Sequence, residues 1–212
     1  MSGRSPLTDW LTALDDALAG AGSLDVPCGT CVACCSSWQF VHIEPDETAT
    51  LAAIPRALRF AAPGLPAGHV VLPHDDRGRC PMLGPHGCTI YAVRPRTCRA
   101  YDCRVFPATG LTSLLATEPD KAAIAARAAE WEAPHGDHGD DGEDGARADD
   151  TERATLRRAG AYLRDHPEVF TDAGRHPPAA TGLAILAVRA RRSFASDRPP
   201  TPEEVRAELQ RP

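Results

Sequence analysis

A helical pattern of apolar residues opens the chain. Three leucines recur at helical spacing between residues 8 and 19, and they are Leu11, Leu14 and Leu18. Leucines at this spacing share one face of a helix, so the pattern predicts an amphipathic helix that docks on the rest of the protein. Thr8 is a suitable N-cap for it, and Gly20 a suitable end.

Helical spacing returns in the last third of the chain. Residues 151–165 and 179–194 each carry apolar side chains on one face and are predicted to form amphipathic helices. Thr201 and Glu204 have the spacing of a capping box, and Pro202 lies between them at a first helical position, so a last helix is predicted from there. The apolar residues of the two longer helices are Leu156, Ala159 and Leu163, then Leu183, Leu186, Ala187, Ala190 and Phe194.

A change of composition separates these helices from the rest. Residues 117–131 predict a helix with Ile124, Ala128 and Trp131 on one face. Residues 133–150 then read APHGDHGDDGEDGARADD, which lacks apolar periodicity and predicts a solvated, disordered linker. Its histidines, His135 and His138, lie among aspartates that could hold an ion loosely, but the linker interpretation is favoured.

The middle of the chain has no long period. Residues 48–54 predict one short helix with Pro45 at its first position, and residues 70–72 are compatible with one short strand. Frequent Pro and Gly elsewhere indicate loops. The predicted fold is mainly α, with a loop-rich, metal-held cysteine-cluster centre, short flanking helices and little β. The expected divisions are 1–25, 26–110, 111–132, 133–150 and 151–212.

All eight cysteines of the 212-residue chain lie in this middle part. The first four form C-x-x-C-x-x-C-C, and the others are more widely spaced. Thiols two residues apart can close on one ion through a tight turn, so the spacing favours metal chelation over distant cross-links. The predicted ligands are Cys28, Cys31, Cys34, Cys35, Cys80, Cys88, Cys98 and Cys103.

Composition and charge narrow the function further. The N-terminus, MSGRSPLTDW, lacks the pattern of a secretion signal, and no segment reaches the roughly 18 apolar residues of a membrane helix, so a cytoplasmic protein is expected. A formal net charge of -6 disfavours nucleic acid as the main partner. Lys121 is the only lysine, and no phosphate-binding G-K-[ST] loop or G-x-S-x-G serine motif is present.

The adjacent pair Cys34 and Cys35 constrains the number of sites. Successive side chains point to opposite faces of an extended chain and about 100° apart on a helix, so the two thiols should rarely serve one ion together. Eight thiols with one adjacent pair therefore predict either two neighbouring four-thiolate sites, or one cluster with extra thiols around it.

The last four cysteines and the residues around them, the second cysteine block, form a distinctive motif. It reads Cys80-Pro81-Met82-Leu83, then Gly87-Cys88-Thr89-Ile90-Tyr91, then Arg94-Pro95-Arg96-Thr97-Cys98-Arg99 and Tyr101-Asp102-Cys103. With C-x-x-C-x-x-C-C this pattern resembles the CxxCxxCC putative zinc- or iron-chelating domain family, the YkgJ-type cysteine-cluster proteins. The resemblance covers residues 26–107 and implies a small bacterial metal-binding protein. A distant, longer branch includes flagellin lysine N-methylases with an iron–sulfur cluster.

Zinc and an iron–sulfur cluster both fit the ligand type. Several thiolates in a loop-rich region favour zinc, which would supply folding energy. The close C-x-x-C-x-x-C run matches the start of a ferredoxin motif, although the Cys-Pro pair, Cys80-Pro81, lies far downstream rather than three residues on. The metal identity stays open between the two.

Several other residues near the cysteines are candidates for a role in the metal site. Four thiolates on a divalent ion leave a net dianion, so the nearby arginines are expected to offset this charge, rather than to form a recognition surface for an anionic partner. Tyr91 is expected to pack and not to catalyse. His86 lies in a predicted turn and is disfavoured as a ligand, while His42 is ambiguous. The arginines are Arg94, Arg96, Arg99 and Arg104.

Three function classes follow. The favoured one is a metal-binding module with a structural, redox or interaction role, whose C-terminal helices offer a surface to a protein partner. The second is an iron–sulfur enzyme acting on a protein substrate, as the resemblance to the methylase branch implies. The third, a zinc-dependent nucleic-acid module, is disfavoured because the basic stretch is short and lacks interleaved aromatics.

Overall fold

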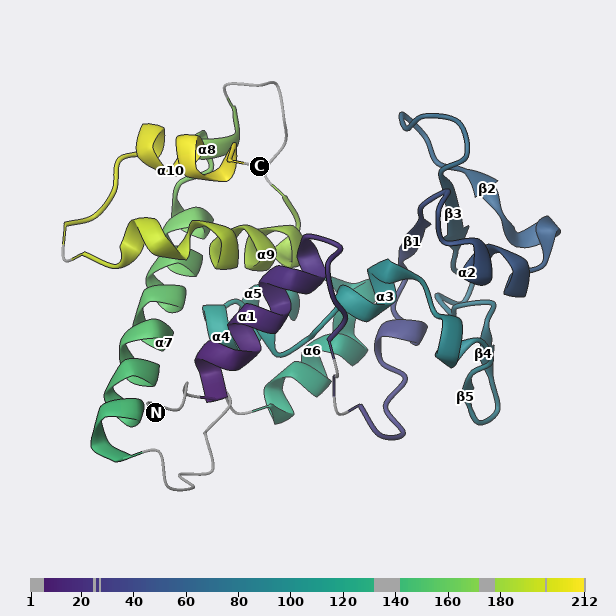
Figure 1. Cartoon of the computed structure of the whole chain (residues 1–212), viewed down its shortest axis with the longest axis horizontal. Coiled ribbons are helices and arrows are strands. Elements are labelled where there is room, and N and C mark those ends of the chain that lie inside the picture. Colours follow the sequence, from purple (N-terminus) through teal and green to yellow (C-terminus); the bar gives the residue numbers. More distant parts are fainter. Residues whose placement is uncertain are drawn as a thin grey trace.

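The computed structural model describes residues 6–24, 26, 28–131, 142–171, 178–196 and 198–211. It is mainly α with little β, which confirms the predicted fold class. The described chain forms two lobes, one of helices and one built on a small sheet (Figure 1). No helix among these residues is both long enough and apolar enough to cross a membrane.

The helical lobe combines the N-terminal helix with everything after residue 104. Its helices come from both ends of the sequence, so that α1 packs against α7, and α9 packs against α4 and α7. They are α1 (Pro6–Leu18), α4 (Val105–Thr109), α5 (Thr112–Leu115), α6 (Ala122–Glu130), α7 (Gly142–Asp165), α8 (Glu168–Thr171), α9 (Ala180–Ala190) and α10 (Pro202–Leu209), with 3₁₀ turns η4 (Pro119–Lys121) and η5 (Arg191–Phe194).

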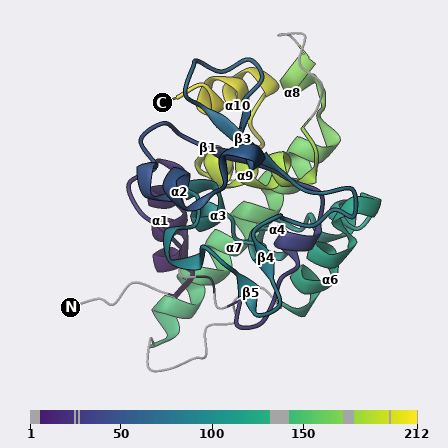
Figure 2. The same ribbon diagram turned by 90° about the vertical axis from the view of Figure 1, so that its right-hand side faces the viewer.

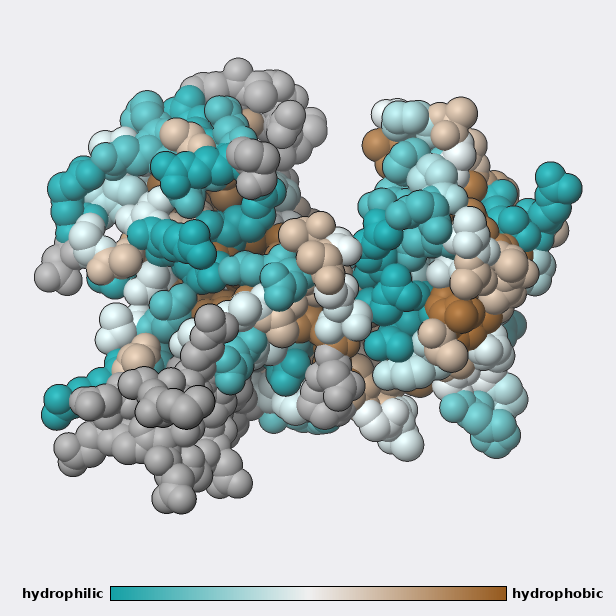
Figure 3. Space-filling view, viewed as in Figure 1, coloured by the Kyte–Doolittle hydropathy of each residue, from teal (hydrophilic) through white to brown (hydrophobic). Residues whose placement is uncertain are grey.

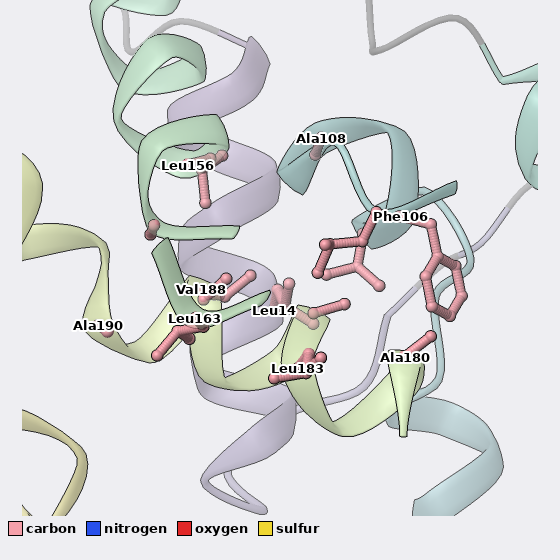
Figure 4. Close-up of a cluster of buried hydrophobic side chains, with 14 of the residues drawn as sticks. Leu14, Phe106, Ala108, Leu156, Leu163, Ala180, Leu183, Val188 and Ala190 are labelled. Atoms are coloured by element: carbon pink, nitrogen blue, oxygen red, sulfur yellow. The ribbon is translucent and has the colours of Figure 1, made fainter. Parts of the chain in front are cut away.

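One apolar core fills this lobe. Leu14 of α1, Phe106 of α4 and Leu156 of α7 are fully buried in it (Figure 4). The helices predicted at residues 151–165 and 179–194 are present, and their apolar faces contribute further buried residues to this core, which confirms both predictions. The capping box at Thr201 is also present, since its side chain accepts a hydrogen bond from Glu204 N.

The small lobe is a three-stranded antiparallel sheet with the order β1-β3-β2. Residues of alternate strand positions, Val41, Ile43 and Leu72, face a second core with Ile54 and Ile90. The elements are β1 (Phe40–Ile43), α2 (Thr48–Ala53), η2 (Arg56–Leu58), β2 (Phe60–Ala61), β3 (Val70–Pro73), the hairpin β4 (Leu83–Gly84) and β5 (Gly87–Cys88), and η3 (Tyr91–Val93).

Two short helices connect the lobes, η1 (Cys34–Ser36) and α3 (Arg96–Ala100). Helix α3 contacts both α1 and β1, and Thr97 Oγ1 donates to the carbonyl of His42 over 2.7 Å. Seen from the side of the small lobe, the sheet and the hairpin lie in front of the helices (Figure 2). The space-filling view shows a notch between the lobes that is open at the top (Figure 3).

The helix boundaries differ from the sequence prediction in three places. Helix α1 begins at Pro6, so Thr8 lies inside it, and Leu18 is exposed while Leu7 and Trp10 are buried. Helix α2 begins at Thr48, so Pro45 precedes the helix, and the buried carboxylate of Glu47 accepts hydrogen bonds from the amides of Glu44 and Arg96 instead.

The third difference concerns the expected linker. Residues 132–141, with His135 and His138, lie outside the described residues, whereas residues 142–150 are the first turns of α7. Once residues 156–163 are packed in the core, adding helical turns at the N-terminal end costs little because the nucleus already exists. The predicted disordered conformation therefore does not hold for residues 142–150, which are helical.

Replacement of Phe106 by alanine is expected to destabilise the protein by about 3–5 kcal/mol, because the ring is fully buried and its removal leaves a cavity. Phe40→Ala is the matched control, since the Phe40 ring is 78% exposed and its loss should cost far less. Urea unfolding of both variants in the same metal state measures the difference. Equal destabilisation by the two changes would contradict the described core.

Candidate metal centre

The eight cysteines gather where the two lobes meet. Cys34 and Cys35 lie in η1, Cys88 ends β5, and Cys98 lies in α3. The remaining four lie in the loops beside these elements. All eight are free thiols, and all but Cys98 are at least partly buried. Segments from about 75 residues of sequence are thereby brought to one region, as the metal hypothesis requires.

The first cluster is folded by local hydrogen bonds. The amide of Cys31 donates to the carbonyl of Cys28 over 2.9 Å, which closes the first C-x-x-C turn. The hydroxyl of Ser37 donates to the carbonyl of Ala33, and this contact holds the end of η1. These bonds fold the backbone that carries the first four cysteines into a compact segment.

The second block is tied to the first through the backbone. The amide of Cys80 donates to the carbonyl of Cys35 over 2.7 Å. The amide of Leu83 then returns to the carbonyl of Cys80, and Leu83 pairs with Cys88 across the β4–β5 hairpin. This turn and hairpin fix Cys80 and Cys88 relative to each other and to Cys35.

Burial keeps several of the thiols protonated. Desolvation is the largest cause that raises the pKa of Cys28 and of Cys80, and it raises the pKa of Cys103 to about 11. The pKa of Cys98 is raised by the protein packed around it and by Cys34, Cys80 and Cys88, even though its side chain reaches the surface. Proximity of thiols to one another adds to the effect at each of these positions.

Cys34 and Cys35 differ from each other. Their sulfurs are 4.0 Å apart, and a hydrogen bond from the Cys35 thiol lowers the pKa of Cys34 to about 7, while the pKa of Cys35 is raised. The sulfurs are closer than the sequence argument implied, because the 3₁₀ turn does not separate successive side chains as an extended strand does. The turn gives one thiol the character of a thiolate and leaves its neighbour protonated.

Among the described residues, no three cysteine, histidine, aspartate or glutamate side chains converge closely enough to form a finished ion site. The donors around the thiols nevertheless fit a thiolate-bound metal. The indole Nε1 of Trp131 is buried, has no hydrogen-bond partner of good geometry, and lies beside the Cys103 sulfur, whose pKa it lowers. The hydroxyl of Tyr101 is also buried, and burial is the largest cause that raises its pKa, with further contributions from the charges of Cys34 and Cys103. Donors of this kind stabilise metal-bound thiolates.

A buried ion pair supports the loop that carries Cys103. Asp102 is almost completely buried and accepts hydrogen bonds from Trp10 Nε1, over 2.8 Å, and from the Arg104 guanidinium. This pair ties α1 to the second cysteine block. Asp102 and Trp10 were not predicted as part of the centre, because a single acidic residue and a tryptophan 92 positions apart carry no signal in the sequence.

Most of the predicted arginines are paired with carboxylates rather than with thiols. Arg96 pairs with Glu44 and Asp46, Arg99 with Glu47, and Arg104 with Asp102. Only Arg94 of this group lowers the pKa of a thiol, that of Cys98, and its guanidinium also covers the ring of Tyr91. Tyr91 is exposed, and its ring packs against Arg94 at the surface rather than in a core.

Arg127 was missed by the sequence analysis. It lies on α6 one turn before Trp131, over whose ring it stacks at 4.4 Å. Its pKa is raised chiefly by an ion pair with Glu130 and also by Cys31 and Cys103, and its charge lowers the pKa of Cys28. An arginine near the end of an alanine-rich helix has no sequence feature that distinguishes it from a solvated one.

Three of the described histidines have positions or partners of their own. His86 is exposed in the β4–β5 turn, as predicted. His42 stacks on His69, with Nε2 and Nδ1 3.0 Å apart. His74 closes a polar turn, where its Nδ1 lies 3.0 Å from the carbonyl of Gly78.

The chain is mainly helical, and its eight cysteines lie in the segments around the boundary between the two lobes. Residues 27–114 match the model of the CxxCxxCC family, a putative zinc- or iron-chelating domain, which confirms the resemblance seen in the motifs. The match spans fewer than half of the 212 residues and contains all eight cysteines. No curated protein and no solved structure matches the chain.

Metal binding at neutral pH is expected to release protons and to strengthen as the pH rises. Cys28, Cys80 and Cys103 hold their protons at neutral pH because their pKa values are raised, whereas a metal takes the thiolate form. Lowering the pH returns protons to the sulfurs and expels the metal. Adding zinc to reduced, metal-free protein in weak buffer with a pH indicator measures the release.

Binding without proton release would contradict ligation by these thiols. An affinity that does not fall between about pH 8 and about pH 6 would contradict it in the same way.

Proposed function

We propose that this protein binds zinc or iron through its eight cysteine thiolates, and that the metal has a structural role, joining the two lobes. The single observation behind the proposal is the position of the thiols, which come from four separate segments and meet at the boundary between the two apolar cores. A metal bound there would link chain segments that regular structure holds only weakly.

The contacts across this boundary support a structural role. The elements there are short, since η1 has three residues, α3 five and the β4 and β5 strands two each. Helices this short are not stable alone. Some of the other links are single hydrogen bonds, such as Leu24 N to Arg99 O and the Lys121 ammonium to the Trp38 carbonyl, and others are ion pairs of α3 with Glu44, Asp46 and Glu47. Metal–thiolate bonds would supply the missing folding energy.

The identity of the metal, zinc or iron, decides whether the protein has a chemical activity in addition to a structural role. Closed four-thiolate zinc sites have no open position for a substrate. A thiolate-bound iron–sulfur cluster would add electron transfer and would favour the enzyme alternative, an activity on a protein substrate.

The proposal of a protein partner at the C-terminal helices is independent of the metal. Much of α7 and α9 is used to build the helical core.

Protein purified without oxygen and without a histidine tag is expected to contain zinc or iron, measured by elemental analysis and an absorption spectrum. Cys31→Ser and Cys98→Ser should each lower the metal content because each removes a thiolate ligand. His86→Gln is the control, since His86 is exposed in the β4–β5 turn and is not one of the predicted ligands. A full metal content in both cysteine variants would refute the assignment of these ligands.

Removal of the metal by a chelator is expected to loosen the centre before the helical core. Amide hydrogen exchange should increase first in residues 28–107, whereas the amides of α7 and α9 should stay protected because their contacts lie in the apolar core. Mass spectrometry of peptides from metal-bound and metal-free protein measures this. Equal loss of protection in both lobes, or none in the centre, would contradict a metal that joins them.

A further inference from the structure

We propose that the thiols form two separate four-thiolate sites, the first from Cys28, Cys31, Cys34 and Cys103, and the second from Cys35, Cys80, Cys88 and Cys98. The assignment rests on the proposed function, since it applies to a centre that binds metal. It places the adjacent cysteines in different sites, so that one peptide bond connects the two.

The first site lies against the helical lobe. Cys34 and Cys103 pack against the apolar core of that lobe. The turn closed by Cys31 N and Cys28 O brings these two thiols together, and the charges of both act on Cys103. Cys28 in turn feels the charges of Cys34 and Cys31. Cys28 is therefore a neighbour of the other three thiols on this side of the boundary, and Cys31 of Cys103 as well.

The second site lies against the small lobe. Cys80 and Cys88 pack against the core of that lobe and are fixed to each other through the pairing of Leu83. The hydrogen bond from Cys80 N to Cys35 O brings in Cys35. The charges of Cys80 and Cys88 act on Cys98, and those of Cys80 and Cys98 act on Cys35. No thiol of the first site except Cys34 acts strongly on this group.

Cys34 and Cys35 mark the border between the sites. Cys34 is close enough to influence Cys80 and Cys98 as well as Cys28, so proximity alone does not assign it. Its packing against the helical core assigns it to the first site, while the backbone bond of Cys35 to Cys80 assigns Cys35 to the second. A tetrahedral zinc site takes four ligands, and this division gives each site four.

Each site also has its own arginine. The charge of Arg127 of α6, which is paired with Glu130, acts on Cys28 and interacts with Cys31 and Cys103, whereas the charge of Arg94 acts on Cys98. A zinc ion with four thiolates carries a net charge of about −2, which needs a nearby cation or N–H donors. Two arginines on opposite sides of the boundary fit two separate anionic sites better than one.

Double variants of the full-length protein test the division. Cys34→Ser/Cys103→Ser removes two ligands of the first site, and Cys35→Ser/Cys80→Ser removes two of the second, so each is expected to keep about half of the wild-type metal. Cys34→Ser/Cys35→Ser removes one ligand from each site and is expected to lose most of it. The metal is counted by elemental analysis of untagged protein purified without oxygen, with circular dichroism to confirm folding.

The outcomes separate this proposal from the proposed function. If all three double variants lose the metal equally, the sites are not separate and the division is overturned, although metal binding stands. If wild-type protein holds no metal, or the variants keep all of it, the proposed function itself fails. Retention of half by Cys34→Ser/Cys35→Ser also overturns the division, because it would place both cysteines in one site.

A measurement on the wild-type chain keeps the test independent of variant folding. Metal-free protein is loaded with ¹¹³Cd and examined by NMR. Two cadmium resonances of all-thiolate type, without coupling between them, are expected for separate sites. A single resonance, or two resonances coupled through a shared sulfur, would overturn the division and indicate one bridged cluster.

Discussion

The structure depends on keeping ionisable sulfur out of water. Eight thiols lie together at the boundary of two apolar cores, and burial raises the pKa of Cys28, Cys80 and Cys103. Protonated thiols in such a place pack as small apolar groups and bind nothing strongly. The same group as thiolates would repel one another unless a cation held them. The arrangement is therefore neutral when protonated and needs a metal when ionised.

Hydrogen bonds and ion pairs hold the segments around the thiols in place. Asp102, Trp10 and Arg104 form a buried network that holds α1 against the loop of Cys103. Trp131 places a buried N–H group beside the sulfur of Cys103. Glu47 fixes the start of α3, which carries Cys98, through the amide of Arg96. Each lobe thus contributes rigid supports to a centre that has little regular structure of its own.

The sequence predicted those parts of the molecule that local rules determine. The helices around Leu14, Leu156 and Leu183, the capping box at Thr201 and the cysteine spacing each depend on residues close together in the chain. The sheet was largely missed, because β1 and β2 are short and β3 joins them only through tertiary pairing. The roles of Arg127 and Asp102 were not predicted for the same reason, since the residues that give them those roles lie far away in the sequence.

The order of segments along the chain has a consequence for biosynthesis. The last thiol is Cys103, whereas the helical core needs Leu156 of α7 and Val188 of α9, which are made later. Domains fold as their segments leave the ribosome, the N-terminal parts first. The thiols are therefore all available while the core that will cover them is still incomplete. On the emerging chain, metal could bind before the helical lobe closes. A shortage of metal would therefore affect the chain before its folding is complete.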